Sequence, residues 1–230
     1  AILLSKKGYE VTLWSAFENY AKEVDKNRLN PKFLPGIKIP REINITGDIK
    51  SAVADKEIIV LAIPSQYTRS VLKKVKPDFS KKSIFLSVTQ GIEIRSLKRI
   101  SEIIYAELGP VNLAVLSGPT IAQEVAKGIP TTAVAASGNQ EIRKTIQSVF
   151  STERFRVYTN PDLVGVELGG SLKNVIAIAC GVSDGLGFGT NTKAAILTRG
   201  LAEMSRLGEA MGAKLKTFSG ISGLGDLVTT

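Results

Sequence analysis

Histidine is absent from this chain of 230 residues. It is the side chain that most often carries protons in enzymes near neutral pH, so its absence narrows the available chemistry. Acid–base catalysis would have to use lysine, aspartate, glutamate, tyrosine or the single cysteine. The most unusual of these side chains is Lys173, which stands in a long apolar segment.

Cysteine is also scarce, because Cys180 is the only one and no internal disulfide can form. A chain without disulfides is typical of a reducing compartment, so we expect a cytoplasmic protein with Cys180 as a core side chain. No uninterrupted apolar run reaches the roughly 18 residues that a membrane span needs. The sequence therefore predicts no membrane-spanning segment.

Acidic residues are outnumbered, and the formal net charge is +9. Nucleic-acid binding is one explanation of such a charge, but the lysines are scattered and lack interleaved aromatics or a nucleic-acid motif. Solvated lysines on helix faces, together with attraction for small anionic ligands, explain the charge better. We therefore predict a small-molecule partner and no nucleic acid.

Short apolar segments alternate with helical patterns over the first 160 residues. The segment EIIVLAI at residues 57–63 is continuously apolar, as in strands that are buried on both faces. Such alternation predicts an α/β domain with a doubly wound, mainly parallel, Rossmann-like sheet. The expected strands are residues 11–14, 57–63, 84–88, 113–116, 131–136 and 155–158.

The pattern changes after residue 160, where only helices are expected, at residues 163–180 and about 191–211. We therefore predict two domains: a dinucleotide-binding domain at 1–160 and an all-helical substrate domain at 161–230. Residues 1–7 resemble the end of a helix, whereas a dinucleotide-binding domain opens with a strand and a glycine-rich turn. This pattern predicts a fragment that lacks the first βα unit.

The helix expected after residue 163 presents Lys173 in an unusual way. Helical side chains lean toward the N-terminus, so the lysine lies over the turn that carries Gly169 and Gly170. We expect an open notch with an apolar wall, which would hold the ammonium group against a small molecule. The alternative is a lysine that extends to the surface. Arg199, on the following helix, is expected to reach an anion or a buried carboxylate such as Glu167.

Three strand ends carry residues suited to ligand contact. They are Ile63–Gln66, Thr89–Glu93 and Ser117–Thr120. Ligands of parallel sheets bind beyond the carboxyl ends of the strands. Each turn taken alone is an ordinary βα connection, but three on one sheet beside a lysine-bearing helix indicate a site. Asp226, taken alone, is an ordinary carboxylate at a helix start.

Longer stretches match a known family. They are residues 116–131 (LSGPTIAQEVAKGIPT), 155–208 and 222–230 (SGLGDLVTT), and weaker segments such as SVTQGIE extend the match over essentially the whole chain. In these stretches the chain resembles the bacterial-type NAD(P)-dependent glycerol-3-phosphate dehydrogenases. The segment 155–208 is highly specific.

The resemblance implies reversible hydride transfer between NAD or NADP and dihydroxyacetone phosphate, giving glycerol 3-phosphate for phospholipid synthesis. It implies that Lys173 is the general acid in the reduction and the general base in the reverse reaction. It also implies a possible homodimer. The matching catalytic positions are Lys173, Asn174, Asp226 and Thr230. The matching substrate positions are Gly118, Thr120, Gln90, Lys173 and Asp226. The matching cofactor positions are Trp14, Ser15, Ile63, Pro64, Gln90 and Ala122.

The chain departs from the family pattern at Gln90, where the family usually has a lysine that contacts substrate and cofactor. An amide still forms hydrogen bonds but cannot neutralise a phosphate. The family's glycine-rich loop and its S-R-N segment, which follows GDLVTT, are also missing. The fragment as given is therefore expected to have reduced activity or none.

Two other functions fit parts of the sequence. A β-hydroxyacid dehydrogenase of the 6-phosphogluconate type shares the two-domain architecture and uses a lysine on the first helix after the sheet. That class lacks the long match at 155–208 and the segment SGLGDL. The second alternative is a non-catalytic basic binding module, in which removal of Lys173 would change no reaction.

Overall fold

A five-stranded sheet forms the centre of the computed structural model, which describes residues 1–230. Its strand order is β5-β6-β7-β8-β9, and all neighbours are parallel except β7 and β8. The strands are β5 (Ile58–Leu61), β6 (Ile84–Ser87), β7 (Asn112–Ser117), β8 (Thr131–Ala136) and β9 (Phe155–Asn160). The predicted mainly parallel sheet is confirmed.

Two smaller strand pairs lie outside this sheet. β1 (Thr12–Trp14) pairs in parallel with β4 (Asn44–Thr46), and β2 (Leu29–Asn30) pairs in antiparallel with β3 (Leu34–Lys38). The sequence predicted β1 alone, because β3 contains Pro35 and Gly36, residues that are rare inside central strands. A two-stranded ribbon tolerates them because each of its strands has one edge without a ladder partner.

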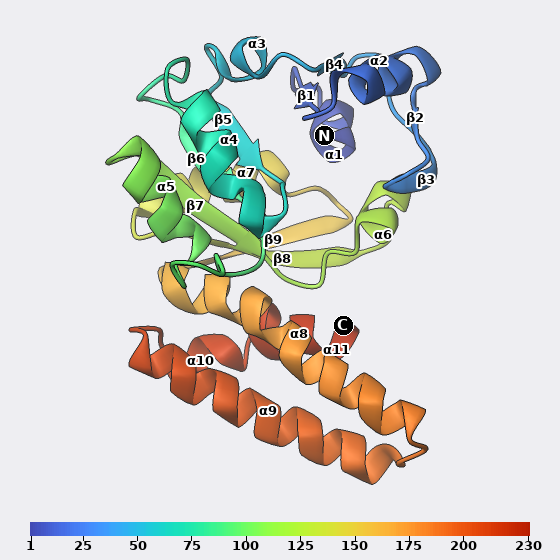
Figure 1. The fold of residues 1–230 in the computed structure, drawn as a ribbon, viewed down its shortest axis with the longest axis vertical. Helices are drawn as coiled ribbons and strands as arrows, with labels where there is room; N and C mark the ends of the chain where they lie inside the picture. The colour runs from blue at the N-terminus through green and yellow to red at the C-terminus, as the bar shows by residue number, and fades with distance from the viewer.

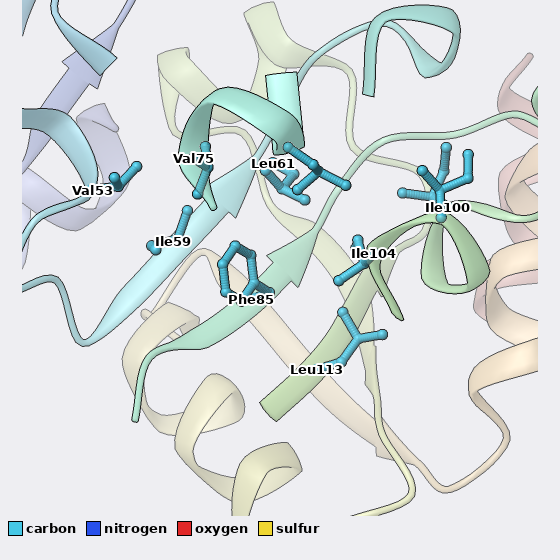
Figure 2. Close-up of a cluster of buried hydrophobic side chains, with 10 residues drawn as sticks. Val53, Ile59, Leu61, Val75, Phe85, Ile100, Ile104 and Leu113 are labelled. Atoms are coloured by element: carbon cyan, nitrogen blue, oxygen red, sulfur yellow. The ribbon is translucent and has the colours of Figure 1, made fainter. Parts of the chain in front are cut away.

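Helices cover both faces of the sheet. Successive side chains of a strand point to opposite sides, so the apolar strands present an apolar surface on each face. Phe85 and Leu113 lie in one apolar cluster with helices α3 (Ile49–Val53), α4 (Thr68–Val75) and α5 (Ile100–Leu108) (Figure 2). Their neighbours Leu86 and Ala114 lie in a second cluster with α7 (Gln140–Phe150). The doubly wound arrangement is therefore confirmed. The other helices of this part are α1 (Ile2–Lys6), α2 (Glu18–Asn27), α6 (Ala122–Lys127) and the 3₁₀ turn Ser65–Tyr67.

Everything after β9 is helical. The two long helices α8 (Leu163–Gly185) and α9 (Thr190–Ala210) form a hairpin on one side of the sheet, opposite the β1–β4 pair (Figure 1). Three short elements follow: α10 (Leu215–Phe218), the π-helical turn η2 (Ile221–Gly225) and α11 (Asp226–Thr229). Both predicted helices are confirmed. The division into two domains at residue 160 stays a prediction.

The start of α8 is fixed against the sheet. Val166 is fully buried and packs on Val115 of β7 and Val134 of β8, near the carboxyl end of β7. On its other side Leu168 joins a cluster with Met204 and Phe218. α8 therefore brings its polar side chains to the edge of the sheet where ligands of such folds bind.

By length and composition α8 is also apolar enough to cross a membrane, with a mean hydropathy of 1.5 over 18 residues. The expectation concerned uninterrupted apolar runs, and charged residues such as Glu167 and Lys173 do interrupt this helix. Its mean hydropathy is nevertheless high enough to pass a test by length and composition. The finding is weak evidence of a span, since a core helix passes the same test. In this fold the first half of α8 is buried against the sheet and η2.

Candidate active site

A cleft of about 1030 Å³ is lined by residues of the sheet, of the β1–β4 unit and of the helical part. Its walls come from the carboxyl ends of strands β1, β5, β6 and β7 and from helices α2, α4, α8 and α11. Ten of the residues expected at the site line it: Trp14, Ser15, Ile63, Pro64, Gln90, Gly118, Thr120, Lys173, Asp226 and Thr230.

Two of the expected residues do not line the cleft. Asn174 follows Lys173 on α8 and is exposed, and Ala122 is exposed at the start of α6. A helix turns by about 100° per residue, so adjacent side chains on α8 point in different directions. The roles of Asn174 and Ala122 stay predictions.

The centre of the site is an ion pair between Lys173 and Asp226. Lys173 Nζ lies 2.5 Å from Asp226 Oδ1, and the two residues are 8% and 2% exposed. Gln90 Nε2 donates to the other carboxylate oxygen, Oδ2, at 3.0 Å. Both oxygens of Asp226 are thus occupied, and Lys173 is held rather than free to extend to the surface.

The ionisation of Asp226 depends on these contacts. Burial raises the pKa of the Asp226 carboxyl above its usual value of 3.8, while the hydrogen bonds from Lys173 and Gln90 act in the opposite direction. Thr230 adds a hydrogen bond from its Oγ1 to the backbone oxygen of Asp226, at 2.8 Å. The end of the chain is therefore attached to the same carboxylate-bearing turn.

Gly169 and Gly170 of α8 have a different role from the one expected. A Cβ on Gly169 would lie 2.4 Å from the backbone oxygen of Ser222, so η2 packs directly against the helix there. A Cβ on Gly170 would lie 2.7 Å from Ser117 Oγ and 3.0 Å from Gln90 Nε2. The predicted open notch is thus filled by the turn η2 and by Gln90. The sequence could not show this, because the filling groups come from distant segments.

The turn that carries Gln90 is tied to neighbouring strands. Thr89 is 7% exposed, and its Oγ1 lies 2.9 Å from the backbone oxygen of Ile63, to which it donates. Gly91 has φ +127°, and a Cβ there would lie 2.6 Å from Ser65 Oγ. The ends of β5 and β6 are therefore locked together with the glutamine facing Asp226.

Gly118 permits a similar close approach at the end of β7. It has φ +142°, and a Cβ there would lie 3.1 Å from the backbone oxygen of Thr132 and 3.2 Å from Ile221 Cγ2. A side chain at this position would meet both β8 and η2. The glycine therefore allows the end of β7 to pack closely against both elements.

The residues present fit a nicotinamide dinucleotide. The cleft lies at the carboxyl ends of parallel strands, where such cofactors bind. Near Trp14 its wall is apolar and aromatic, with Leu13, Phe17 and Tyr20. A flat aromatic base is well accommodated by such a surface.

One buried carboxylate was assigned the wrong partner by sequence reasoning. Glu167 is bound by Arg99, whose Nη1 lies 2.8 Å from Glu167 Oε2, and by Ser101. Arg199, the expected partner, is exposed and forms no ion pair. Little in the sequence indicated that Arg99 is the partner of Glu167. Arg99 stands at the start of an amphipathic helix, where a surface arginine is common.

Comparison with known proteins gives consistent matches. The family model described as NAD-dependent glycerol-3-phosphate dehydrogenase N-terminus matches residues 1–143, and the corresponding C-terminus model matches residues 162–230. A protein of Fusobacterium nucleatum, named glycerol-3-phosphate dehydrogenase [NAD(P)+], is 49% identical over 232 residues. The match covers 100% of this chain and 69% of that protein. A protein of the same name from Pelotomaculum thermopropionicum is 48% identical, with 99% and 66% covered.

Solved structures agree with this result. The crystal structure of glycerol-3-phosphate dehydrogenase from Coxiella burnetii superposes with a TM-score of 0.95 at 39% identity, covering 99% of this chain and 70% of that one. The yeast glycerol-3-phosphate dehydrogenase GPD1 gives a TM-score of 0.86 at 29% identity, with 99% and 71% covered. The fold and the sequence thus point to the same group of proteins.

Proposed function

The chain belongs to the family of NAD-dependent glycerol-3-phosphate dehydrogenases, and from this premise we propose how its cleft carries out the reaction. The enzyme is an NAD(P)-dependent oxidoreductase that interconverts dihydroxyacetone phosphate and glycerol 3-phosphate. The matches give no support to a 6-phosphogluconate-type dehydrogenase or to a non-catalytic binding module. The roles of individual residues in this reaction are our proposal.

The proposal depends on one observation, the buried pair of Lys173 and Asp226 in the cleft wall. When bound, the reduced nicotinamide supplies the hydride that adds to the carbonyl carbon of the substrate. The carbonyl oxygen then gains negative charge and needs a proton. Among the residues that line the cleft, Lys173 is the cation that is also buried beside a carboxylate.

Lys173 acts as the general acid in this direction. An ammonium group has three N–H donors, so one can remain on Asp226 while another reaches the substrate oxygen. The low exposure of the pair strengthens its electrostatic effect on a developing alkoxide. In the reverse reaction the neutral amine accepts the hydroxyl proton of glycerol 3-phosphate.

Asp226 and Gln90 position the lysine. Asp226 accepts hydrogen bonds from both, on separate oxygens, so that its orientation is set from two sides. Thr230 supports the same turn through the backbone oxygen of Asp226. Gly118 and Thr120 line the same cleft, and we place the substrate beside them.

The test is substitution of Lys173 in the full-length enzyme. Lys173→Gln keeps a side chain that can donate to Asp226 but cannot supply a proton, so kcat should fall by roughly 10²–10⁴-fold. Binding of NADH, followed by its fluorescence, should persist. The matched control is Lys193→Gln, because Lys193 also pairs with an aspartate, Asp184, but at the surface. Turnover by Lys173→Gln close to that of the control would overturn the proposed role.

Three further features of the protein are also proposals. We place it in the cytoplasm, as a homodimer, with a domain boundary near residue 160. The single cysteine supports the location, and the change from mixed to purely helical structure after β9 supports the boundary. Sedimentation equilibrium of the full-length protein would test the dimer, and cell fractionation the location.

A further inference from the structure

A second buried carboxylate lies on α8, before the proposed catalytic lysine, and the reaction described above does not use it. The Glu167 side chain is 1% exposed. Its Oε1 accepts a hydrogen bond from Ser101 N at 2.8 Å, and its Oε2 accepts from Ser101 Oγ at 2.6 Å and from Arg99 Nη1 at 2.8 Å. A buried carboxylate is stable only when hydrogen bonds or a counter-charge replace its lost hydration. The three donors therefore fix the position of the Glu167 carboxylate.

The donors stand at the start of α5, on the sheet side of the molecule. Ser101 is in the first turn of that helix, where backbone N–H groups have no partner within the helix and carry partial positive charge. Glu167 supplies the missing acceptor. The contact therefore joins α8 to the first turn of α5 at a fixed distance and in a fixed orientation.

This contact is close to Lys173 along the helix. Glu167 and Lys173 are six positions apart, which at 1.5 Å per residue is about 9 Å along the axis of α8. Between them Gly169 packs directly on η2. The helix is thus held from the sheet side by Glu167 and from the helical side by η2, immediately before the lysine.

The same contact is also connected to the turn that carries Gln90. The backbone of Arg99 forms a bridge with Ile92, two residues after Gln90. Gly91 N donates to Ser171 Oγ on α8 at 3.0 Å. Gln90 and Lys173, which meet on the two oxygens of Asp226, are therefore positioned by one connected set of contacts.

We propose that Glu167, bound by Ser101 and Arg99, is a positioning residue that sets the place of the Lys173 ammonium relative to the substrate carbonyl. The proposal rests on the proposed role of Lys173 as general acid. A displacement of about 1 Å in a reacting group can lower the rate by up to about 100-fold. Loss of the contact should therefore act on kcat and leave cofactor binding nearly unchanged.

A matched pair of serine substitutions separates positioning from stability. Ser101→Ala removes one of the three donors to Glu167. Ser137→Ala is the control, because Ser137 is also 2% exposed and its Oγ donates to the backbone oxygen of Leu113 at 2.6 Å, at the end of β7 away from the cleft. Each hydroxyl also accepts a hydrogen bond, Ser101 Oγ from Arg99 Nη1 and Ser137 Oγ from Asn139 N, so each variant loses one donated and one accepted bond. Both variants are expected to melt at lower temperature than the wild type.

Only Ser101→Ala should change the chemistry. We expect its kcat to fall about 10-fold and its KM for NADH to stay within about twofold of the wild type. Rates with NADH deuterated at the transferred position give a second readout. The isotope effect should rise in Ser101→Ala, because a misplaced acid slows the chemical step, and stay at the wild-type value in Ser137→Ala. Partial unfolding does not alter this ratio, since it removes active molecules equally from both measurements.

Glu167→Gln is the second variant, which keeps the shape and one acceptor but loses the charge that Arg99 binds. It should show the same fall in kcat and rise in isotope effect. If both variants match Ser137→Ala in kcat and isotope effect while Lys173→Gln is inactive, the positioning role is wrong and the role of Lys173 stands. If Lys173→Gln turns over normally, both proposals fall.

Discussion

Lys173 and Asp226 are 53 residues apart in the chain, yet their side chains form a buried ion pair with Nζ 2.5 Å from Oδ1. The first belongs to α8 and the second begins α11. η2 packs directly on Gly169 of α8, and Asp226 follows η2 at once, which brings its carboxylate to the lysine. The proposed chemistry of the site therefore depends on how the short elements after α9 fold back.

Removing the charge of Asp226 should be costly. Asp226→Asn leaves a buried ammonium without a counter-charge, and loss of one partner of such a pair typically costs about 3–5 kcal/mol of unfolding free energy. Asp184→Asn is the control, because its pair with Lys193 is about half exposed and should contribute no more than about 1 kcal/mol. Urea denaturation at neutral pH measures both. Equal losses in the two variants would show that the Asp226 pair is not effectively buried.

A lysine at position 90 should strengthen binding of the phosphate-bearing substrate. In the present cleft the charge of Lys173 is offset by Asp226, and Gln90 contributes none. We expect Gln90→Lys to lower the KM for dihydroxyacetone phosphate several-fold at low salt, and the gain to shrink as salt screens the added charge. The surface variant Gln140→Lys adds the same charge far from the cleft and should leave KM unchanged. A KM for Gln90→Lys that is insensitive to ionic strength contradicts the electrostatic explanation.

Two glycines of the same helix should respond oppositely to alanine. At Gly170 a methyl group would meet Ser117 Oγ at 2.7 Å and Gln90 Nε2 at 3.0 Å, so Gly170→Ala should cost about 1–3 kcal/mol and lower kcat by displacing Gln90. At Gly181 a Cβ has no atom within 4 Å. Gly181→Ala should therefore stabilise the protein by up to about 1 kcal/mol, from helix propensity alone. Thermal melts and steady-state rates of both variants check this contrast.

The turn that carries Gln90 should lose stability in acid through Glu93. Hydrogen bonds from Arg69 and Ser96 lower the pKa of Glu93 from 4.5 to about 2. The unfolded chain therefore takes up the proton first as the pH falls, so this stabilisation is complete above about pH 4.5 and is lost toward pH 2. The difference in unfolding free energy between the wild type and Glu93→Gln should be constant from pH 7 to about 5 and decrease below that.

Glu141→Gln, at an 82% exposed position on α7, is the surface control for this measurement. Denaturant titrations of the three proteins at intervals between pH 7 and pH 2 provide the comparison. The prediction is contradicted if the wild type exceeds Glu93→Gln in unfolding free energy by the same amount at pH 2 as at pH 7.

Local patterns predicted the sheet well because strands that are buried on both faces are apolar at nearly every position. The run at residues 57–63 is apolar at nearly every position and contains β5, as expected. β3 was missed because Pro35 and Gly36 argue against a central strand, and nothing local distinguishes a peripheral ribbon from a loop. The start of α8 followed from its apolar composition, whereas its end lies at Gly185, beyond the predicted residue 180.

The site was predicted in part. Lys173, Gln90, Asp226 and Gly118 were singled out from strand ends, the lysine-bearing helix and the family motifs, and all four line one cleft. The partner of Glu167 was not. Arg199 and Arg99 are both arginines on amphipathic helices, and only packing decides which of them faces α8.

The sequence by itself determined the alternation of strands and helices, the apolar helix with its lysine, and the absence of histidine that makes this lysine the candidate proton carrier. These properties depend on periodicity and composition, which can be read from a short segment without knowing what it packs against. The tertiary structure decided that Gly169 and Gly170 are contact points rather than an open notch, and that Asp226 closes over Lys173. Such contacts join segments 50 to 80 residues apart, and their geometry depends on the packing of the whole sheet and helical part, which no local pattern records.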